Sequence, residues 1–331
     1  MPSPLSVQSE SRSLGGTAPG NGVITLSIGL IVVFWAVNFI AAKIGLRSLP
    51  ALAMASFRVV LAGLVMLPVY FVFRRLSPSA GAARTRMADF SGRDYWTFLY
   101  LGFFGVSVNQ ICFTVGLRYT SVEHAAVIVG LGPIYILVLA VLLRLESWTW
   151  RKASGMLISL AGVTIMAGET GIAPHSPTLR GNLITLGGSL GFAMYAVLGK
   201  RVAGKYDALT MTAFNHFAGA LIVLPVALRE ALQFGSTEQW RAVGWQAWAA
   251  TAYMAVCGSA AAYLLYFWLL RYLPASKVSA FTYLLPVCAT ILGIWWLGEK
   301  GSWAQFGGGA LALAGVYWIE SGRPAIANGA R

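Results

Sequence analysis

Apolar residues fill this chain in long runs, and mostly short polar links separate them. A helix that crosses a membrane needs about 20 predominantly apolar residues in a row. The pattern predicts an all-α polytopic membrane protein with ten transmembrane helices, in which short links make consecutive helices antiparallel neighbours. The predicted spans are 23–42, 51–73, 95–117, 123–143, 149–167, 179–199, 208–228, 246–270, 277–297 and 302–320.

The composition indicates that lipid surrounds most of the chain. Of the 331 residues, 57% are hydrophobic and 11% are charged, whereas an ordinary soluble domain carries about 25% charged residues. The net charge of +13 comes from basic residues between apolar runs, without a cluster of interleaved basic and aromatic residues. We therefore expect contact with a lipid bilayer and its anionic headgroups, and no nucleic-acid partner.

The chain contains an internal repeat. Residues 118–163 align with residues 271–316 without a gap, at a constant offset of 153. Such a run of matches indicates a duplication rather than chance. Identical pairs include Pro133 with Pro286, Glu146 with Glu299, Gly155 with Gly308 and Gly162 with Gly315.

The first two spans repeat as well, at an offset of 157. Lys43 falls on Lys200, and Phe57 on Phe214. Each half then holds five spans, and because five is odd, the second half enters the membrane from the opposite side. This predicts two inverted-topology five-helix repeats, an architecture of secondary transporters. The predicted domains are a disordered tail over 1–21, repeats over 22–168 and 178–320, and a tail over 321–331.

The basic residues of the links predict an orientation. Sixteen Lys and Arg residues lie on the side of the N-terminal tail and seven on the other, while Arg58 lies inside a span. Loops rich in Lys and Arg stay in the cytoplasm. We expect a multi-pass protein of the plasma membrane (the bacterial inner membrane) with both termini in the cytoplasm.

The repeated motif resembles a known family. Pro133, followed by Leu-Glu at 145–146, Trp150, Gly155 and Ala-Gly-Val at 161–163, is similar to the EamA-type transporters of the drug/metabolite transporter superfamily. The second copy carries Pro286, Glu299, Trp303, Gly308 and Ala-Gly-Val at 314–316, but has Gly298 in place of Leu145. The resemblance covers residues 23–320. It implies ten helices in two inverted halves, a central cavity, and movement of small metabolites or drugs, often outward.

Polar and aromatic residues inside the spans are the candidates for substrate binding. A polar group within the membrane costs free energy unless it has a partner, so each could simply bond a neighbouring helix. As a set drawn from both halves, they predict a wet, aromatic-lined cavity that suits an amphiphilic metabolite better than an inorganic ion. The candidates are Arg58, Trp35, Asn38, Asn109, Gln110, Asn215, His216, Tyr263, Tyr266 and Tyr283.

Arg58 is the charged residue among these candidates. Its repeat partner, Asn215, is neutral, so the scaffold does not demand a charge. A guanidinium can hold a carboxylate or phosphate through two N–H groups. An anionic group on the substrate, as in an amino acid, is one interpretation, and a structural bond to helix carbonyls is the other.

Two prolines are predicted hinges. Pro133 and Pro286 stand ten residues into their spans, about 15 Å deep by helix rise. Proline removes a helical hydrogen bond and clashes with the preceding turn. The alternatives are a static kink that helps packing and a hinge, or exposed carbonyls, at the transport site.

Other chemistry-bearing residues receive structural interpretations. Glu146 and Glu299 are expected to cap the helix that follows each of them. No carboxylate lies near mid-membrane, and His216 is the deep group that titrates near neutrality, more often a packing residue than a proton carrier. Three cysteines in apolar runs give no disulfide pattern or metal-ligand spacing, so we expect no metal, no cofactor and no catalytic residue.

The sequence thus favours a secondary transporter, expected to export small amphiphilic molecules such as amino acids or drugs by alternating access. It is not expected to be an enzyme, because a membrane-embedded enzyme would need a nucleophile–base set or metal ligands at mid-depth. A non-transporting membrane scaffold is the other alternative. The expected partners are a small-molecule substrate and the bilayer, and the prediction leaves room for a homodimer.

Overall fold

Helices are the regular elements throughout the part of the chain that the structure describes. This computed structural model describes residues 19–76, 90–120, 125, 128–168, 179–234, 237–285, 287, 288, 291 and 303–321. In chain order the elements are α2 (Asn21–Gly45), α3 (Ala51–Leu76), α4 (Gly92–Leu101), η2 (Gly102–Val108), α5 (Asn109–Tyr119), α7 (Gly132–Leu142), α8 (Trp150–Gly168), α9 (Leu179–Val202), α10 (Ala208–Gln233), α11 (Thr237–Ala242), α12 (Trp245–Tyr253), η3 (Met254–Ala261), α13 (Ala262–Tyr272), α14 (Ala275–Ala280), η4 (Phe281–Tyr283) and α16 (Trp303–Glu320).

Six helices of the described chain are long and apolar enough to cross a membrane. Two of them are composite, since α4, η2 and α5 run on as one helix, and so do α12, η3 and α13. The remaining predicted spans contain α7, α8, α14 and α16. The six are Asn21–Gly45, Ala51–Leu76, Gly92–Tyr119, Leu179–Val202, Ala208–Gln233 and Trp245–Tyr272.

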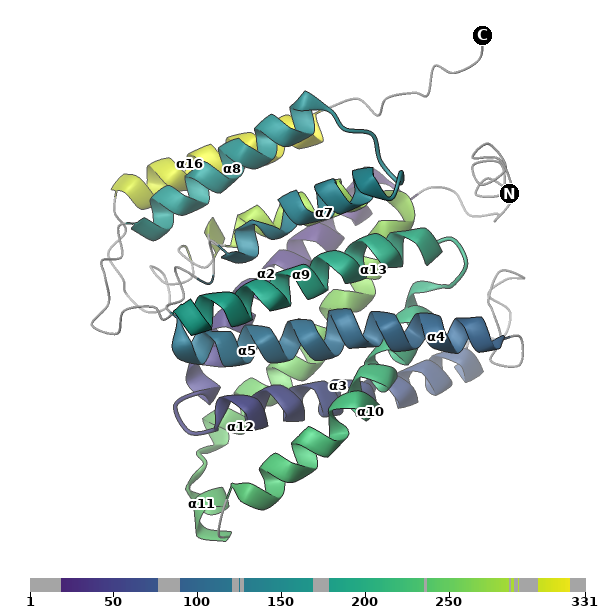
Figure 1. Ribbon diagram of the computed structural model, residues 1–331, viewed down its shortest axis with the longest axis vertical. Helices are drawn as coiled ribbons and strands as arrows, with labels where there is room; N and C mark the ends of the chain where they lie inside the picture. Colours follow the sequence, from purple (N-terminus) through teal and green to yellow (C-terminus); the bar gives the residue numbers. More distant parts are fainter. Residues whose placement is uncertain are drawn as a thin grey trace.

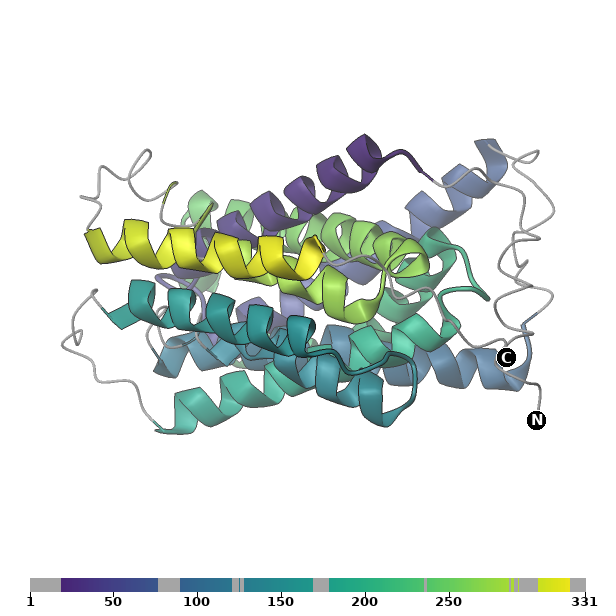
Figure 2. The ribbon, with the colours of Figure 1, turned by 90° about the horizontal axis from the view of Figure 1, so that it is seen from above.

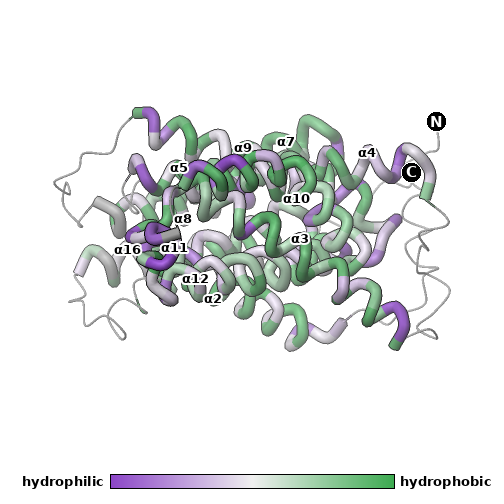
Figure 3. Tube along the Cα trace, turned by 90° about the horizontal axis from the view of Figure 1, so that it is seen from below, coloured by the Kyte–Doolittle hydropathy of each residue, from purple (hydrophilic) through white to green (hydrophobic). Residues whose placement is uncertain are grey.

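The helices lie side by side along one common direction (Figures 1 and 2). In Figure 1, α8 and α16 form one edge of the bundle, α3 and α10 lie towards the other, and α7, α9, α2 and α13 fill the space between. Hydrophobic residues dominate along the helices, and many of the hydrophilic ones gather towards the two ends of the bundle (Figure 3). This distribution suits a protein whose sides face lipid.

Helices that correspond in the repeat pack against each other. Helix α3 packs along α10, and a Cβ added to Gly63 would lie 2.6 Å from the Cβ of Ala220. Position 220 is the repeat partner of position 63, at the offset of 157. Small residues allow this close approach, which is the usual basis of helix association in membranes.

The glycines of the repeated motif perform the same task between α8 and α16. A Cβ on Gly155 would lie 2.9 Å from the carbonyl oxygen of Gly315, and a Cβ on Gly162 would lie 2.5 Å from that of Gly308. Gly155 corresponds to Gly308 and Gly162 to Gly315, so the second contact repeats the first with the halves exchanged. The motif glycines are therefore helix-packing residues.

Two π-helical segments interrupt the long composite helices. At the offset of 153, η2 (102–108) corresponds to residues 255–261, which lie within η3 (254–261). A π-helical turn uses hydrogen bonds between residues five apart and often marks a functional site. Hydrophobic periodicity does not reveal such segments, and both were unpredicted.

The fourth and ninth predicted spans are less regular than simple helices. Helix α7 begins at Gly132 with Pro133 in its first turn, where the missing proline N–H costs no hydrogen bond within the helix. In the ninth span, α14 continues into η4, a 3₁₀ turn over Phe281–Tyr283. The predicted hinge Pro286 lies outside the described residues.

Candidate functional site

A cavity lies at the centre of the bundle, between helices from both repeats. Its volume is about 90 Å³. One enclosed water needs about 10–15 Å³. The cavity can therefore hold several waters or part of a small organic molecule. Its lining is Trp35, Asn38, Phe39, Arg58, Asn109, Gln110, Phe113, Val129, Gly132, Pro133, Ile136, Thr185, Gly188, Ser189, Phe192, Gly258, Tyr263, Ser279, Thr282 and Leu285.

The cavity brings together six of the ten candidate residues, together with one predicted hinge. They come from α2, α3, α5, α7 and α13, which are distant in sequence. The seven are Trp35, Asn38, Arg58, Asn109, Gln110, Tyr263 and Pro133.

Arg58 is held by a hydroxyl group on the second-half π-helical segment. Its Nη2 donates to Ser259 Oγ at 3.0 Å. Ser259 Oγ in turn lies 2.9 Å from both Gln110 Oε1 and the carbonyl oxygen of Met254, to either of which it can donate. Ser259 thus links Arg58 of α3 to Gln110 of α5.

Gly258, beside that serine, brings α2 to the same place. Its carbonyl oxygen accepts a hydrogen bond of 3.0 Å from Trp35 Nε1. A Cβ on Gly258 would lie only 2.4 Å from Asn38 Oδ1, so the absence of a side chain is what allows Asn38 to approach. The Gly258–Ser259 pair is therefore the point where Trp35, Asn38, Arg58 and Gln110 converge.

Tyr263 occupies the corresponding place at the first-half π-helical segment. Its hydroxyl lies 2.8 Å from the carbonyl oxygen of Gly105 and 2.9 Å from Asn109 Oδ1, and can donate to either. Asn109 Nδ2 donates to the Gly188 carbonyl oxygen at 2.9 Å, which ties α5 to α9. Most polar groups on this side of the cavity thus bond within the protein.

Aromatic rings form a cluster beside the cavity. The Phe192 ring centroid lies 5.6 Å from that of Trp35, 6.1 Å from that of Tyr263 and 5.1 Å from that of Tyr266. Such tilted and edge-to-face contacts fix ring positions. They give the cavity a rigid apolar wall.

Several buried polar atoms at the cavity have no partner among the described groups. They are Nε and Nη1 of Arg58, Nε2 of Gln110 and Oδ1 of Asn38. Arg58 is 3% exposed, and a buried charge without an opposite charge is costly. The ion pairs of the described residues, which do not include Arg58, are Arg74–Asp207, Lys152–Glu146 and Lys205–Asp94.

The other four candidates lie away from the main cavity. Asn215 and His216 are fully buried in α10; His216 Nδ1 lies 2.9 Å from the Thr212 carbonyl oxygen and its ring packs edge-on against Tyr263. Tyr266 belongs to the aromatic cluster and lines a smaller neighbouring hollow. These three stand behind the residues that line the cavity.

Tyr283 packs instead against α8 and α16, in a cluster with Met156 and Val316. Tyr283 ends η4, the 3₁₀ turn that follows α14. Because such a turn advances about 120° per residue instead of 100°, it rotates Tyr283 away from the face that an unbroken α-helix would give it. Ser279 and Thr282 reach the cavity, whereas the next residue points elsewhere. Sequence periodicity for an unbroken α-helix misplaces this tyrosine.

Pro133 lines the cavity from the first turn of α7. Proline has no N–H to donate to the carbonyl four residues earlier, which here belongs to Val129, another lining residue. The neighbouring Ile128 carbonyl oxygen accepts from Ser189 Oγ at 3.3 Å. The hinge and exposed-carbonyl interpretations of Pro133 stay predictions, and Pro286 lies outside the described residues.

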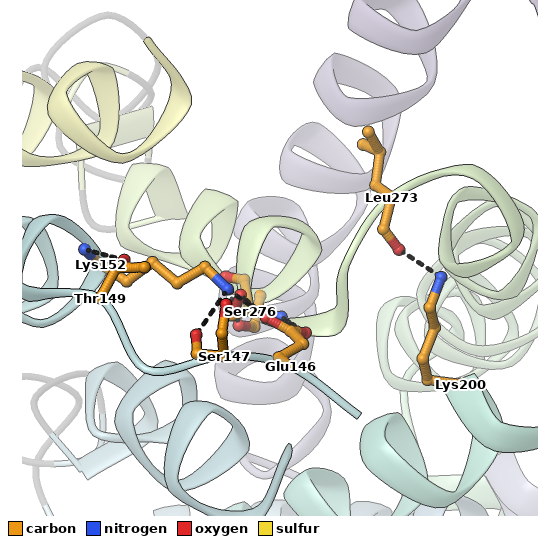
Figure 4. A network of polar contacts seen from close by, with 8 residues as sticks. Glu146, Ser147, Thr149, Lys152, Lys200, Leu273 and Ser276 are labelled. Atoms are coloured by element: carbon orange, nitrogen blue, oxygen red, sulfur yellow. Dashed lines mark hydrogen bonds and ion pairs between the residues drawn. The ribbon is translucent and has the colours of Figure 1, made fainter. Parts of the chain in front are cut away.

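Glu146 caps a helix, but not the one that was predicted. Instead of binding the N-terminus of α8, the helix that follows it, Glu146 Oε1 accepts from the Ser276 backbone N–H at 3.0 Å, at the start of α14 in the other repeat. Its Oε2 accepts from Ser276 Oγ and lies 2.7 Å from Lys152 Nζ (Figure 4). Residues of the two repeats meet here, so the helix that follows Glu146 in the sequence is not the one that it caps. Glu299 lies outside the described residues.

This cluster shifts the ionisation of the carboxyl group. Burial by itself raises the pKa of Glu146, but the hydrogen bonds from Lys152 and Ser276 outweigh it, so the pKa lies below its usual range. Nearby, Lys200 Nζ donates to the carbonyl oxygen of Leu270 at 2.6 Å. It also donates to that of Leu273 at 2.9 Å (Figure 4). These bonds join the α7–α8 connection to the start of α14, and α9 to the end of α13.

The sequence interpretation missed Phe192, which lines the cavity, and Ser259, which holds Arg58. Phe192 could have been found, because it is the repeat partner of the candidate Trp35 at the offset of 157. Ser259 carries no such signal, since a serine in a run of small residues usually serves helix packing. Within the described residues, no group of three or more His, Cys, Asp or Glu side chains could hold a metal ion.

Comparison with known proteins gives a consistent result. The family model described as the EamA-like transporter family matches residues 23–168 and 179–321. An uncharacterized transporter of Archaeoglobus fulgidus is 26% identical over 299 residues, which cover 90% of this chain and 97% of that protein. A probable terminal-alkyne amino-acid exporter of Streptantibioticus cattleyicolor is 24% identical over 291 residues, covering 88% of this chain and 91% of the exporter.

A solved crystal structure has a similar fold. It covers 90% of this chain and 96% of its own, with a TM-score of 0.69 and 18% sequence identity. At that identity the likeness concerns the fold alone.

Proposed function

The chain belongs to the EamA-like transporter family, and from that premise we propose that it is a secondary transporter that exports small amphiphilic metabolites, such as amino acids or drugs, by alternating access. The observation that carries the proposal is the central cavity. It is lined by a buried arginine, amides and aromatic rings from both repeats. A site at the interface of two repeats suits a mechanism in which one half moves against the other.

The proposed architecture is ten helices in two inverted five-helix repeats, 22–168 and 178–320. Three contacts support it: Gly63 with Ala220, Gly155 with Gly315, and Gly162 with Gly308. Gly63 and Ala220 are equivalent positions in the two halves. Exchanging the halves converts the Gly155–Gly315 contact into the Gly162–Gly308 contact, as a twofold relation between the halves requires. The matching places of η2 and η3 add support.

The proposed location is the plasma membrane, with both termini in the cytoplasm. The excess of Lys and Arg in links on the side of the N-terminal tail supports this orientation. The cluster around Glu146 would then lie at the cytoplasmic end of the bundle. Its bonds across the repeat boundary would hold that end in one of the states of the transport cycle.

Export of amino acids is favoured by one relative. The exporter from Streptantibioticus cattleyicolor is named for an amino-acid substrate, and the cavity offers both a cationic group and an apolar wall. A membrane scaffold or an embedded enzyme has no comparable observation in its favour.

Transport can be tested with purified protein in liposomes. Radiolabelled phenylalanine and a panel of apolar amino acids and amphiphilic drugs would be loaded inside, and their loss compared with that from protein-free vesicles. Saturable, chemically unchanged efflux is expected for at least one compound. If every compound in the panel leaked at the protein-free rate, the transporter proposal would fail and the scaffold would be favoured.

A further inference from the structure

The cavity lining combines one buried cationic group with aromatic rings, and this combination points to one class of substrate. We infer that the cavity binds an amphiphilic organic carboxylate, with the carboxylate at Arg58 and Gln110 and the apolar body against Phe192 and Tyr263. This inference rests on the proposed transport function and deepens it, because it assigns the substrate's charge and the direction in which it lies.

The carboxylate end is built from unused donors. Among the described residues, Arg58 makes one side-chain hydrogen bond, from Nη2 to Ser259, and its Nε and Nη1 have no partner there. Gln110 is oriented by the same serine through its Oε1, so its Nε2, also unpartnered, is a donor of fixed position. An oxoanion accepts several such N–H bonds at once, and each is stronger for being charge-assisted.

The charge of the site matches a single carboxylate. Of the described residues that line the cavity, Arg58 is the one that carries a charge. A phosphate monoester carries about −1.5 to −2 charges near neutral pH and would leave negative charge uncompensated in a site that burial makes intolerant of it. A carboxylate carries one, and neutralises the arginine.

The repeat partners of the polar cavity residues differ from them in charge and side-chain type. At the offsets of the repeat, Asn38 corresponds to Tyr195, Arg58 to Asn215, and Gln110 to Tyr263. The first set surrounds Gly258 of η3. Of the second set, Tyr263 bonds the carbonyl of Gly105 in η2, and the Tyr195 ring lies against the same glycine. Of the first set, all three residues line the cavity, and Arg58 among them is charged. Of the second set, only Tyr263 lines it, and this residue is neutral and aromatic.

A molecule with one charged and one apolar end therefore fits in one direction. In the reverse direction it would place a carboxylate against aromatic rings and leave the guanidinium against hydrocarbon. Both changes carry the cost of an unpaired buried charge. Asn38 Oδ1, which has no partner among the described residues, can accept a hydrogen bond from an N–H or O–H group of the same molecule.

The test is equilibrium binding to the full chain in detergent by calorimetry, using three probes with one phenyl ring each. They are 3-phenylpropionate, phenethylamine and phenyl phosphate. We expect 3-phenylpropionate to bind at least tenfold more tightly than the other two. Arg58→Gln should weaken its binding at least tenfold, and Arg58→Lys nearly as much, because lysine keeps the charge but loses the fork. Arg47→Gln, which removes an exposed arginine, is the matched control and should change nothing.

Ser259→Ala is a second variant in case Arg58 variants do not fold. It leaves the guanidinium in place but removes the hydroxyl group that orients it. The variant should bind 3-phenylpropionate severalfold more weakly, with no change in phenethylamine binding. The inference is overturned by native-like binding in Arg58→Gln, by equal binding of phenethylamine or phenyl phosphate, or by absence of 3-phenylpropionate binding to folded native protein. Efflux of the same probes from liposomes separates the two proposals. Movement that ignores the carboxylate overturns this inference alone, whereas Arg58-dependent binding without movement overturns transport alone.

Discussion

At the scale of single residues, the site depends on positions where a side chain is absent. Gly258 lets Asn38 Oδ1 come so close that a Cβ would lie 2.4 Å from it. Its counterpart Gly105 does the same for the Tyr195 ring, at 2.3 Å from a built Cβ. The two glycines thus set the distance between the π-helical segments and the helices that face them.

Gly258→Ala should impair binding more than folding. The clash is with the end of a flexible side chain, so Asn38 can rotate away and leave the helices in place. We expect substrate affinity to fall about tenfold, equivalent to 1.4 kcal/mol, with little change in melting temperature. Gly29→Ala, in α2 with open space around it, is the control for both measurements. A large loss of thermal stability without loss of affinity would contradict the expectation.

The sequence predicted these residues unequally. Trp35, Asn38, Arg58 and Gln110 are conspicuous because polar or amphipathic groups are rare inside apolar runs, so position alone marks them. Tyr283 is equally conspicuous but lies elsewhere, because a local 3₁₀ turn changes the direction in which it points. Polar residues within apolar runs can be recognised from the sequence as candidates for the cavity. The backbone geometry determines which of these candidates lie together.

At the scale of elements, helix pairs differ in how well they accommodate a larger side chain at their contact. Helices α8 and α16 touch through backbone atoms, since a Cβ on Gly162 would lie 2.5 Å from both Ala312 N and the Gly308 carbonyl oxygen. A backbone cannot rotate aside as a side chain can. This pair should therefore be more sensitive to small substitutions than the cavity glycines.

Gly162→Ala should separate α8 from α16 and destabilise the protein by about 1–3 kcal/mol, the usual cost of overpacking. The measurement is the unfolding midpoint in a denaturing-detergent titration, with Gly29→Ala as the neutral comparison. Equal midpoints for the two variants would show that the helices adjust without cost.

The Glu146 cluster predicts a pH dependence. Because the folded-state pKa of Glu146 lies below the usual range, its ionised form stabilises the fold at pH values above the unfolded carboxyl pKa of about 4.3. That contribution is lost as the pH falls through the lower, folded-state value. Native protein should therefore melt at a higher temperature than Glu146→Gln at pH 7, and the difference should shrink in acid. A difference that grew in acid would mean that the ionised carboxylate is unfavourable.

At the scale of the whole molecule, the duplication predicts more than any single helix does. It gave the correspondence between Phe57 and Phe214 and between Gly155 and Gly308, and the structure places the corresponding helices α3 and α10, and α8 and α16, side by side. The π-helical segments, the short α11 and the bond from Glu146 to α14 could not be predicted, because they depend on contacts between segments distant in sequence.

Labelling with a membrane-impermeant thiol reagent tests the inverted arrangement. In a variant without Cys112, Cys257 and Cys288, single cysteines would replace Arg75 and Lys205, or Arg47 and Gln233. The cysteines at positions 75 and 205 should react from the cytoplasmic side, and those at 47 and 233 from outside. An odd number of predicted spans separates each position of the first pair from each position of the second. Opposite sides for positions 75 and 205 would refute the inverted repeat.

The matching π-helical segments also record an order of events in the ancestry of the chain. A π turn accommodates one residue more than an α turn, and the two segments stand at corresponding places in both repeats. The simplest history is a single insertion in an ancestral gene half this length, followed by duplication. Two copies of that ancestor, paired head to tail across the membrane, would have enclosed a cavity with identical ends. Two identical chains would carry the same residue at both places, so the difference between Arg58 and Asn215 requires both copies to lie in one chain.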